Sequence, residues 1–121
     1  VYPATATEWS YGNCCGAEAD CSAGGGSSPL PSNTLDASCA QHDECYASTG
    51  TWASPAENGA SIVCDCELAT AAGAIYDNEE HDMDMAYAAS NVRAAICSQI
   101  RAHNQQRARR GEPVIPCPAC D

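Results

Sequence analysis

Residues 36–46 read Asp-Ala-Ser-Cys-Ala-Gln-His-Asp-Glu-Cys-Tyr, and this stretch decides the fold. No Gly or Pro interrupts it, so the sequence predicts a helix of about three turns. Cys39, His42 and Tyr46 would share one face, because side chains three and four residues apart are neighbours on a helix. Asp43 follows four residues after Cys39. A histidine and a carboxylate are therefore expected side by side on a helix that cysteines can fasten to the rest of the chain.

The composition indicates a small, disulfide-reinforced domain. The 121 residues include ten cysteines, two Trp and no Phe, so the core is modest. An even, high number of cysteines in a short chain is typical of disulfides formed in an oxidising compartment, which predicts secretion. We expect one domain over residues 1–121. No leader pattern precedes Val1, so we expect a mature chain from which the leader has been removed.

The charge balance limits the possible partners. The formal net charge is −11, with 16 acidic residues against five basic ones, all of them Arg. We expect no nucleic-acid partner, because phosphate contacts need a basic face. No apolar run approaches the roughly 20 residues that span a bilayer, so no transmembrane segment is expected.

Two further helices follow the first in the sequence. One should begin between residues 55 and 61 and carry an apolar stripe that includes Cys64, Leu68 and Ile75, lying antiparallel to the first helix. The longest helical pattern runs over residues 84–110 and ends at Gly111 with Pro113. Its apolar face is expected to comprise Ala88, Val92, Ile96, Ile100 and His103, with His103 a surface residue in the last turns. Ser32 or Asn33 can cap the first helix.

Two motifs resemble those of the secreted phospholipases A2. Residues 39–46, Cys-Ala-Gln-His-Asp-Glu-Cys-Tyr, match the family's active-site helix signature, Cys-x-x-His-Asp-x-Cys followed by Tyr. Residues 11–16, Tyr-Gly-Asn-Cys-Cys-Gly, are similar to the family's calcium loop and precede that helix in the right order. The resemblance also covers residues 64–67. It implies a mainly α-helical, disulfide-rich fold of the compact plant or microbial branch, in which two antiparallel helices carry the active site and the calcium loop precedes them.

The resemblance implies a secreted hydrolase that degrades lipids. Such an enzyme cleaves the sn-2 acyl ester of glycerophospholipids to a free fatty acid and a lysophospholipid. His42 would be the general base that activates water. Glu67 takes the position of the acid that orients this histidine, with Asp65 as the other candidate, and Tyr46 would assist. The backbone N–H of Gly16 would donate to the oxyanion.

The resemblance also implies a calcium site and a lipid partner. Asp43 would supply the carboxylate ligand, and backbone carbonyls would come from Cys14, Gly16 and a residue near Ala19. The substrate would be a phospholipid membrane or micelle surface, which a monomer contacts transiently from one side. The implied disulfides are Cys15–Cys39 and Cys45–Cys66, with Cys14–Cys21 a local possibility.

Three other interpretations of the motifs compete with this one. A zinc module could use Cys39, His42, Cys45 and the Cys64-x-Cys66 pair, but it would leave Asp43 without a purpose. A phospholipase scaffold without catalysis could serve as a binding protein or toxin subunit, although such forms tend to lose His42 or Asp43. The tail motif of residues 117–120, Cys-Pro-Ala-Cys, is better explained by structural bridges than by redox chemistry.

Overall fold

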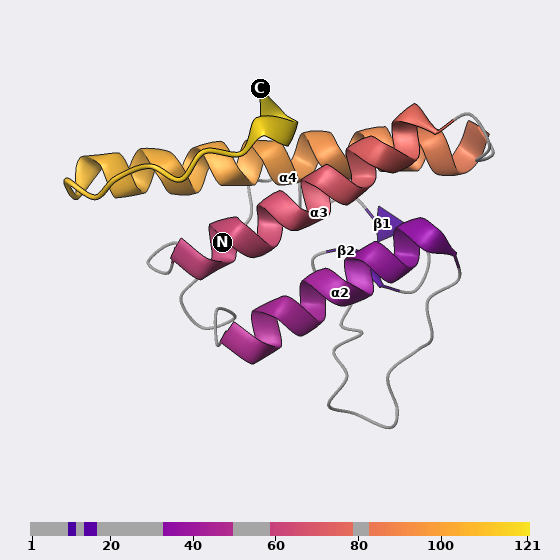
Figure 1. Ribbon diagram of the computed structural model, residues 1–121, viewed down its shortest axis with the longest axis horizontal. Helices are drawn as coiled ribbons and strands as arrows, with labels where there is room; N and C mark the ends of the chain where they lie inside the picture. The colour runs from indigo at the N-terminus through magenta and orange to yellow at the C-terminus, as the bar shows by residue number, and fades with distance from the viewer. Residues whose placement is uncertain (1–9, 12–13, 17–32, 50–58, 79–82) are drawn as a thin grey trace.

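The computed structural model describes residues 10–11, 14–16, 33–49, 59–78 and 83–121 (Figure 1). The described elements are, in chain order, β1 (Ser10–Tyr11), β2 (Cys15–Gly16), α2 (Thr34–Thr49), α3 (Gly59–Asp77), α4 (Met83–Arg109) and the 3-10 turn η1 (Pro118–Cys120). The two short strands pair antiparallel, with Tyr11 opposite Cys15. The described part of the chain is therefore mainly α-helical, as predicted, and each expected helix is present.

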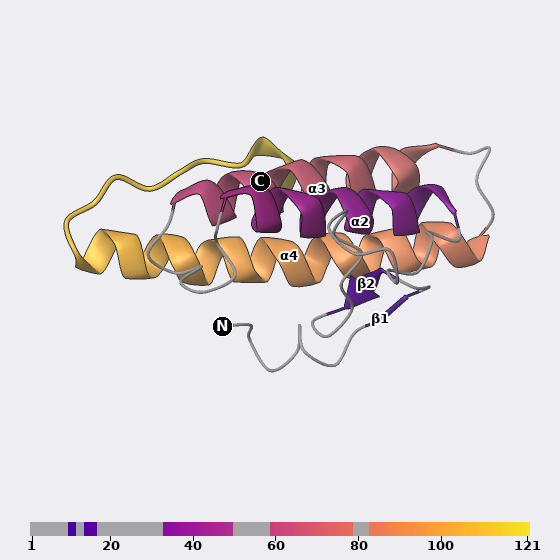
Figure 2. The same ribbon diagram turned by 90° about the horizontal axis from the view of Figure 1, so that it is seen from below.

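The three helices run in alternating directions, and α3 packs against both α2 and α4 (Figure 1). Seen from below, α2 and α3 lie on the same side of α4 (Figure 2). The predicted antiparallel arrangement of the first two helices is thus confirmed. After α4 the chain turns back along this helix, and η1 contacts α3 and α4. No described helix is both long enough and apolar enough to cross a bilayer.

The core lies where the apolar stripes of the three helices meet. Leu68 and Ile75 of α3 are buried, as are Val92, Ile96 and Ile100 of α4, so both predicted stripes are confirmed. Burying each such side chain favours folding by about 1.5–3 kcal/mol. Ala residues at 69, 72 and 89 are also buried, and their small side chains let α3 and α4 approach closely.

Local signals fix two of the helix ends. The side chain of Asn33 caps α2, since its Oδ1 accepts the backbone N–H of Asp36 at 2.9 Å. At the end of α4, Gly111 adopts a φ of 76°, which glycine tolerates without a side-chain clash. The next residue, Glu112, donates its N–H to the carbonyl of Arg107 at 2.9 Å, closing the turn. The predicted stop at Gly111 is confirmed.

Four disulfides connect the described elements: Cys15–Cys39, Cys45–Cys64, Cys66–Cys117 and Cys97–Cys120. The first agrees with the pairing that the resemblance implies, and the last two confirm that the tail cysteines form structural bridges. Cys14, whose pairing the sequence left open, is also disulfide-bonded, and Cys21, the local alternative named above, lies outside the described residues. No described cysteine is free, so the zinc module, which needs thiolates, is wrong.

The expected Cys45–Cys66 bridge is wrong, because Cys45 bonds Cys64. Since α2 and α3 are antiparallel, moving towards the C-terminus of α2 means moving towards the N-terminus of α3. His42 faces Asp65, so Cys45, three residues further along α2, meets the residue before Asp65 rather than the one after it. Cys66 lies on another side of α3, where it bonds Cys117 of the C-terminal segment.

His103 is a second correction. The prediction of a surface residue is wrong, because only 1% of His103 is exposed. It continues the buried face of α4, and the C-terminal segment returns over the last turns of this helix. The Asn104 side chain fixes that segment, accepting the N–H of Ile115 at 2.9 Å and donating to its carbonyl at 2.8 Å. The buried face of α4 therefore extends to a position that local sequence marks as exposed.

Candidate active site

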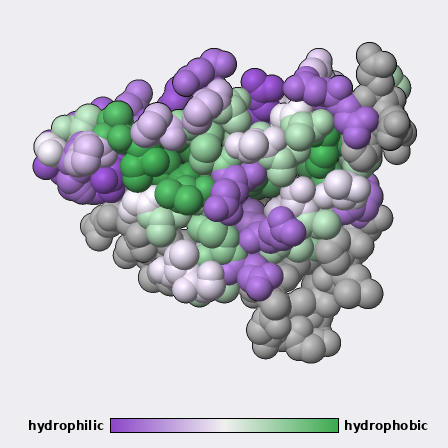
Figure 3. Space-filling model, viewed as in Figure 1, coloured by the Kyte–Doolittle hydropathy of each residue, from purple (hydrophilic) through white to green (hydrophobic). Residues whose placement is uncertain are grey.

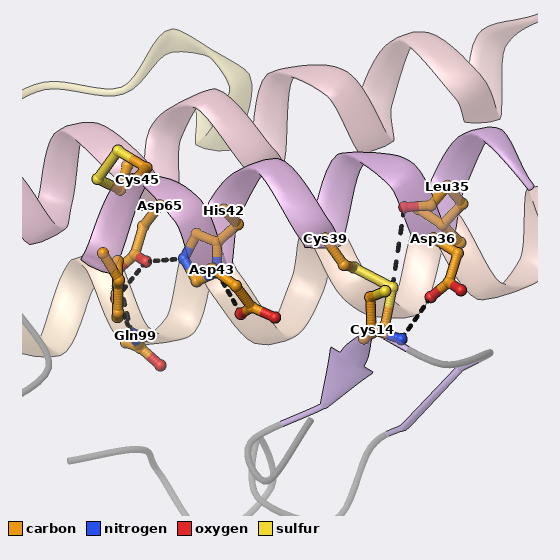
Figure 4. A network of polar contacts seen from close by, with 12 residues as sticks. Cys14, Leu35, Asp36, Cys39, His42, Asp43, Cys45, Asp65 and Gln99 are labelled. Atoms are coloured by element: carbon orange, nitrogen blue, oxygen red, sulfur yellow. Dashed lines mark hydrogen bonds and ion pairs between the residues drawn. A yellow bond between two sulfur atoms is a disulfide. The ribbon is translucent and has the colours of Figure 1, made fainter. Parts of the chain in front are cut away.

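A buried histidine–aspartate pair joins α2 to α3. His42 Nε2 lies 2.7 Å from Asp65 Oδ1, and Asp65 is fully buried while 7% of His42 is exposed (Figure 4). An ionised carboxylate offers only acceptors, so the imidazole must donate from Nε2. The other ring nitrogen, Nδ1, is then left with a lone pair. The pair thus presents a nitrogen that can accept a proton.

Two more side chains hold the carboxylate of Asp65. The hydroxyl of Tyr46 donates to Oδ1 at 2.5 Å, and its ring lies against the imidazole of His42 with centroids 4.4 Å apart. Gln99 of α4 donates from Nε2 to Asp65 Oδ2 at 3.0 Å and to the Tyr46 hydroxyl at 3.1 Å. The Asp65 carboxylate therefore accepts hydrogen bonds from three buried side chains, two of them from α2 and one from α4.

The orienting contact that the sequence assigned to Glu67 is made by Asp65. Residues two apart on a helix point in nearly opposite directions, so only one of these two acids can face His42. Asp65 points inward, and Glu67 is exposed. Glu67 still lies near the histidine, because both line a small hollow of about 30 Å³ with Gln41 and Leu68. Tyr46 makes the assisting contact that was expected of it.

Asp43 lies on the other side of His42 from Asp65. Its Oδ1 is 4.0 Å from His42 Nδ1, and 4% of the residue is exposed. This separation is too long for a hydrogen bond but is one that a single oxygen atom can bridge. The nitrogen with the lone pair therefore lies close to a buried carboxylate with no direct hydrogen bond between them, and one oxygen atom beside the two groups could contact both.

Residues 14–16 of the second motif are linked to α2, the helix that carries Asp43. Cys15 bonds Cys39, which precedes Asp43 by four residues and so shares its helix face. The N–H of Cys14 donates to the buried carboxylate of Asp36 at 2.8 Å, and β2 packs against α2 (Figure 4). Cys14 and Gly16 are thus brought to the helix that carries Asp43. Ala19, the third expected carbonyl donor, lies outside the described residues.

Of the residues that the resemblance assigns to calcium, only Asp43 would bind through its side chain. Within the described ranges, no three side chains of His, Cys, Asp or Glu gather around one point. The implied calcium set is of another kind, since it takes one carboxylate from Asp43 and its remaining oxygens from backbone carbonyls and water. A buried carboxylate beside a strand that is bonded to its own helix fits that requirement.

Gln99 is the site residue that the motifs did not reveal. It stands in α4 between Ile96 and Ile100, within the run of core positions spaced by three and four residues. A polar residue at such a position is a recognisable signal, because a buried amide needs partners. The sequence could therefore flag Gln99 as unusual, but nothing local indicates which partners it meets.

The comparisons with known proteins add no relative, since no family model, curated protein or solved structure matches the chain. The assignment of a function therefore depends on the motifs and on the geometry around His42.

Proposed function

We propose that the protein is a secreted, calcium-dependent phospholipase A2 that hydrolyses the sn-2 acyl ester of glycerophospholipids. The observation that supports this most directly is the juxtaposition at His42: Nε2 is held by Asp65 at 2.7 Å, and Nδ1 faces Asp43. This arrangement couples a general base to an oxygen ligand for a hard cation. The resemblance of residues 11–16 and 39–46 to the family's motifs points to the same chemistry. The phospholipase A2-like fold is part of the proposal.

In this mechanism, His42 Nδ1 accepts a proton from the water that attacks the sn-2 carbonyl carbon. The imidazolium that forms keeps its Nε2–H on the Asp65 carboxylate, which stabilises the new positive charge. The backbone N–H of Gly16 donates to the oxyanion. The proton on His42 then passes to the glycerol oxygen as the ester C–O bond breaks, releasing the fatty acid and the lysophospholipid.

Calcium would be held by Asp43 and by the backbone carbonyls of Cys14 and Gly16, with a residue near Ala19 as the third carbonyl donor. When bound, it supplies a positive charge that polarises the ester carbonyl and binds the phosphate. Asp43 is buried and close to the strand that contains Cys15 and Gly16, so the residues present are compatible with such an ion.

An apolar groove beside the histidine supports a lipid substrate. It has a volume of about 470 Å³ and is lined mainly by apolar atoms of α3 and of the C-terminal segment, among them Val63, Ala74 and Ile115. Glu67 and Ala71 line both this groove and the smaller hollow at His42. Hydrophobic residues gather between the C-terminal segment and the first half of α3 on the face shown in Figure 3. An acyl chain is a ligand that such a surface suits.

The deciding experiment measures fatty acid release from a phosphatidylcholine with different acyl chains at sn-1 and sn-2. We expect release from sn-2 only, with calcium, and its loss on adding a chelator. His42→Gln should abolish release while calcium affinity stays within about twofold of wild type. Asp43→Asn should weaken calcium binding and release together, because it removes the charged ligand.

Two outcomes would contradict the proposal. Release that persists in His42→Gln would remove the histidine from the mechanism. Folded wild-type protein that releases nothing at millimolar calcium would favour a phospholipase-like scaffold that binds a partner without catalysis.

A further inference from the structure

Gln99 occupies a position where an apolar residue would be expected on packing grounds. It is 1% exposed, and its neighbours on the inner face of α4 include Val92, Ile96 and Ile100. Its Oε1 is buried and accepts no hydrogen bond from the described residues. A buried acceptor without a donor is destabilising, whereas a Leu or Met here would avoid that cost. Packing therefore gives no reason for an amide at this position.

The amide nitrogen gives that reason. Nε2 carries two hydrogens and directs one to Asp65 Oδ2 and the other to the Tyr46 hydroxyl. Tyr46 has a single hydroxyl hydrogen, which it gives to Asp65 Oδ1. By accepting from Gln99, the hydroxyl is turned so that this hydrogen points at Asp65. The amide therefore fixes both carboxylate oxygens, one directly and one through Tyr46.

The rotation of this carboxylate determines the state of His42. Asp65 Oδ1 must lie in line with Nε2 for the imidazole to keep its proton there and to leave Nδ1 as the acceptor. If the carboxylate turned about its own axis, the Nε2 contact would weaken and the other tautomer would become accessible. That tautomer carries its proton on Nδ1, the nitrogen that faces Asp43.

We propose that Gln99 is a positioning residue that holds the Asp65 carboxylate and, through it, the Nε2–H tautomer of His42. Its consequence for catalysis rests on the proposed function, but its effect on the tautomer does not. A neutral amide is required for this role. An apolar residue would leave Asp65 Oδ2 without a donor, and a glutamate would place a second carboxylate about 3 Å from the first, where two such groups compete for one proton.

The test compares Gln99→Met with wild type and with Gln105→Leu, a matched control on the exposed side of the same helix. Methionine fills nearly the same volume and removes the unsatisfied Oε1, so the variant is expected to fold. If it does not, Gln99→Leu takes its place. Long-range ¹H–¹⁵N NMR spectra report the tautomer of His42 from the shifts of its two ring nitrogens.

We expect the Nε2–H form alone in wild type and in Gln105→Leu, and a mixture of both tautomers in Gln99→Met. In the hydrolysis assay, kcat of Gln99→Met should fall about 10- to 100-fold, as for loss of one hydrogen bond to a charged group, while KM changes less than about twofold. A folded Gln99→Met protein with the wild-type tautomer would overturn the proposal. If the tautomer changes but wild type releases no fatty acid, the positioning role stands and only the proposed function fails.

Discussion

The substitution Asp65→Asn tests the centre of the proposed active site with little change of shape. The asparagine would keep an oxygen for His42 and Tyr46 but would turn an amide group towards Gln99, which donates at 3.0 Å in the wild type. The Gln99 amide can flip, so that its Oε1, which accepts nothing from the described residues, receives that new donor. The packing should therefore survive, while the negative charge is lost.

The magnitude follows from the three hydrogen bonds that Asp65 accepts. A bond to a charged group contributes about 1 kcal/mol more than a neutral one. The bonds from His42 and Tyr46 each lose this increment, and so does the bond to Gln99, because the flipped amide keeps only a bond between neutral groups. The flip also ends the bond from Gln99 to the Tyr46 hydroxyl. We therefore expect the free energy of unfolding to fall by about 3–4 kcal/mol, or Tm by roughly 12–16 °C in a chain of this length.

The same loss of charge should lower the rate of hydrolysis. A neutral asparagine side chain cannot stabilise the imidazolium that forms when His42 accepts a proton. Fatty acid release should fall by about 10²- to 10⁴-fold, the range that general acid–base catalysis contributes. The assay pairs thermal unfolding followed by circular dichroism with the sn-2 release measurement at saturating calcium.

Glu67→Gln is the matched control, because it makes the same chemical change two residues away on the same helix. Glu67 is exposed, so its stability effect should stay within about 0.5 kcal/mol and release should change less than about threefold. The reverse result, with Glu67→Gln inactive and Asp65→Asn active, would refute the assignment of the orienting acid to Asp65.

Two further predictions concern the rest of the fold. The Cys66–Cys117 bridge spans 51 residues, and its removal by a double Cys→Ser change should lower the free energy of unfolding by about 4 kcal/mol. The Cys45–Cys64 bridge spans 19 residues, and the same change there should lower it by about 3 kcal/mol. Urea titration of both variants checks the order, and equal or reversed losses would contradict the loop-entropy reasoning. A hydrogen bond from Arg110, with the charges of Arg110 and Arg107, holds the pKa of Glu112 below its ordinary value of 4.5. The stabilisation of the fold by this pairing is fully present above pH 4.5 and is lost as the pH falls through the lower pKa of the folded state. In Arg110→Gln, the pKa of Glu112, measured by ¹³C titration of its carboxyl group, should move towards 4.5. An unchanged pKa would argue against the pairing.

Part of this molecule could be predicted from short-range patterns because those patterns act within one or two helical turns. The placement of His42, Tyr46 and Cys39 on one face requires only helical spacing, and the turn at Gly111 requires only a residue that tolerates positive φ. The Cys15–Cys39 bridge was implied by the resemblance and is present. These features do not depend on how the helices are oriented relative to one another.

Other features depend on the rotation of α3 about its own axis, which no local pattern specifies. Two cysteines and two acids alternate over residues 64–67, and both choices made from the sequence, Cys66 and Glu67, differ from the contacts in the fold. A single rotation accounts for both, since packing of the α3 stripe against α2 and α4 turns Cys64 and Asp65 inward.

The sequence alone therefore determined the helices, their apolar faces and the presence of a histidine–carboxylate motif. Only the tertiary structure decided which acid holds the histidine, that Gln99 reaches that acid from α4, and that His103 is buried. The physical reason is the same in each case. Helix-forming preferences act between residues close in sequence, whereas the contacts around Asp65 and Tyr46 join residues from 19 to 53 positions apart, and only packing of the whole core brings them together.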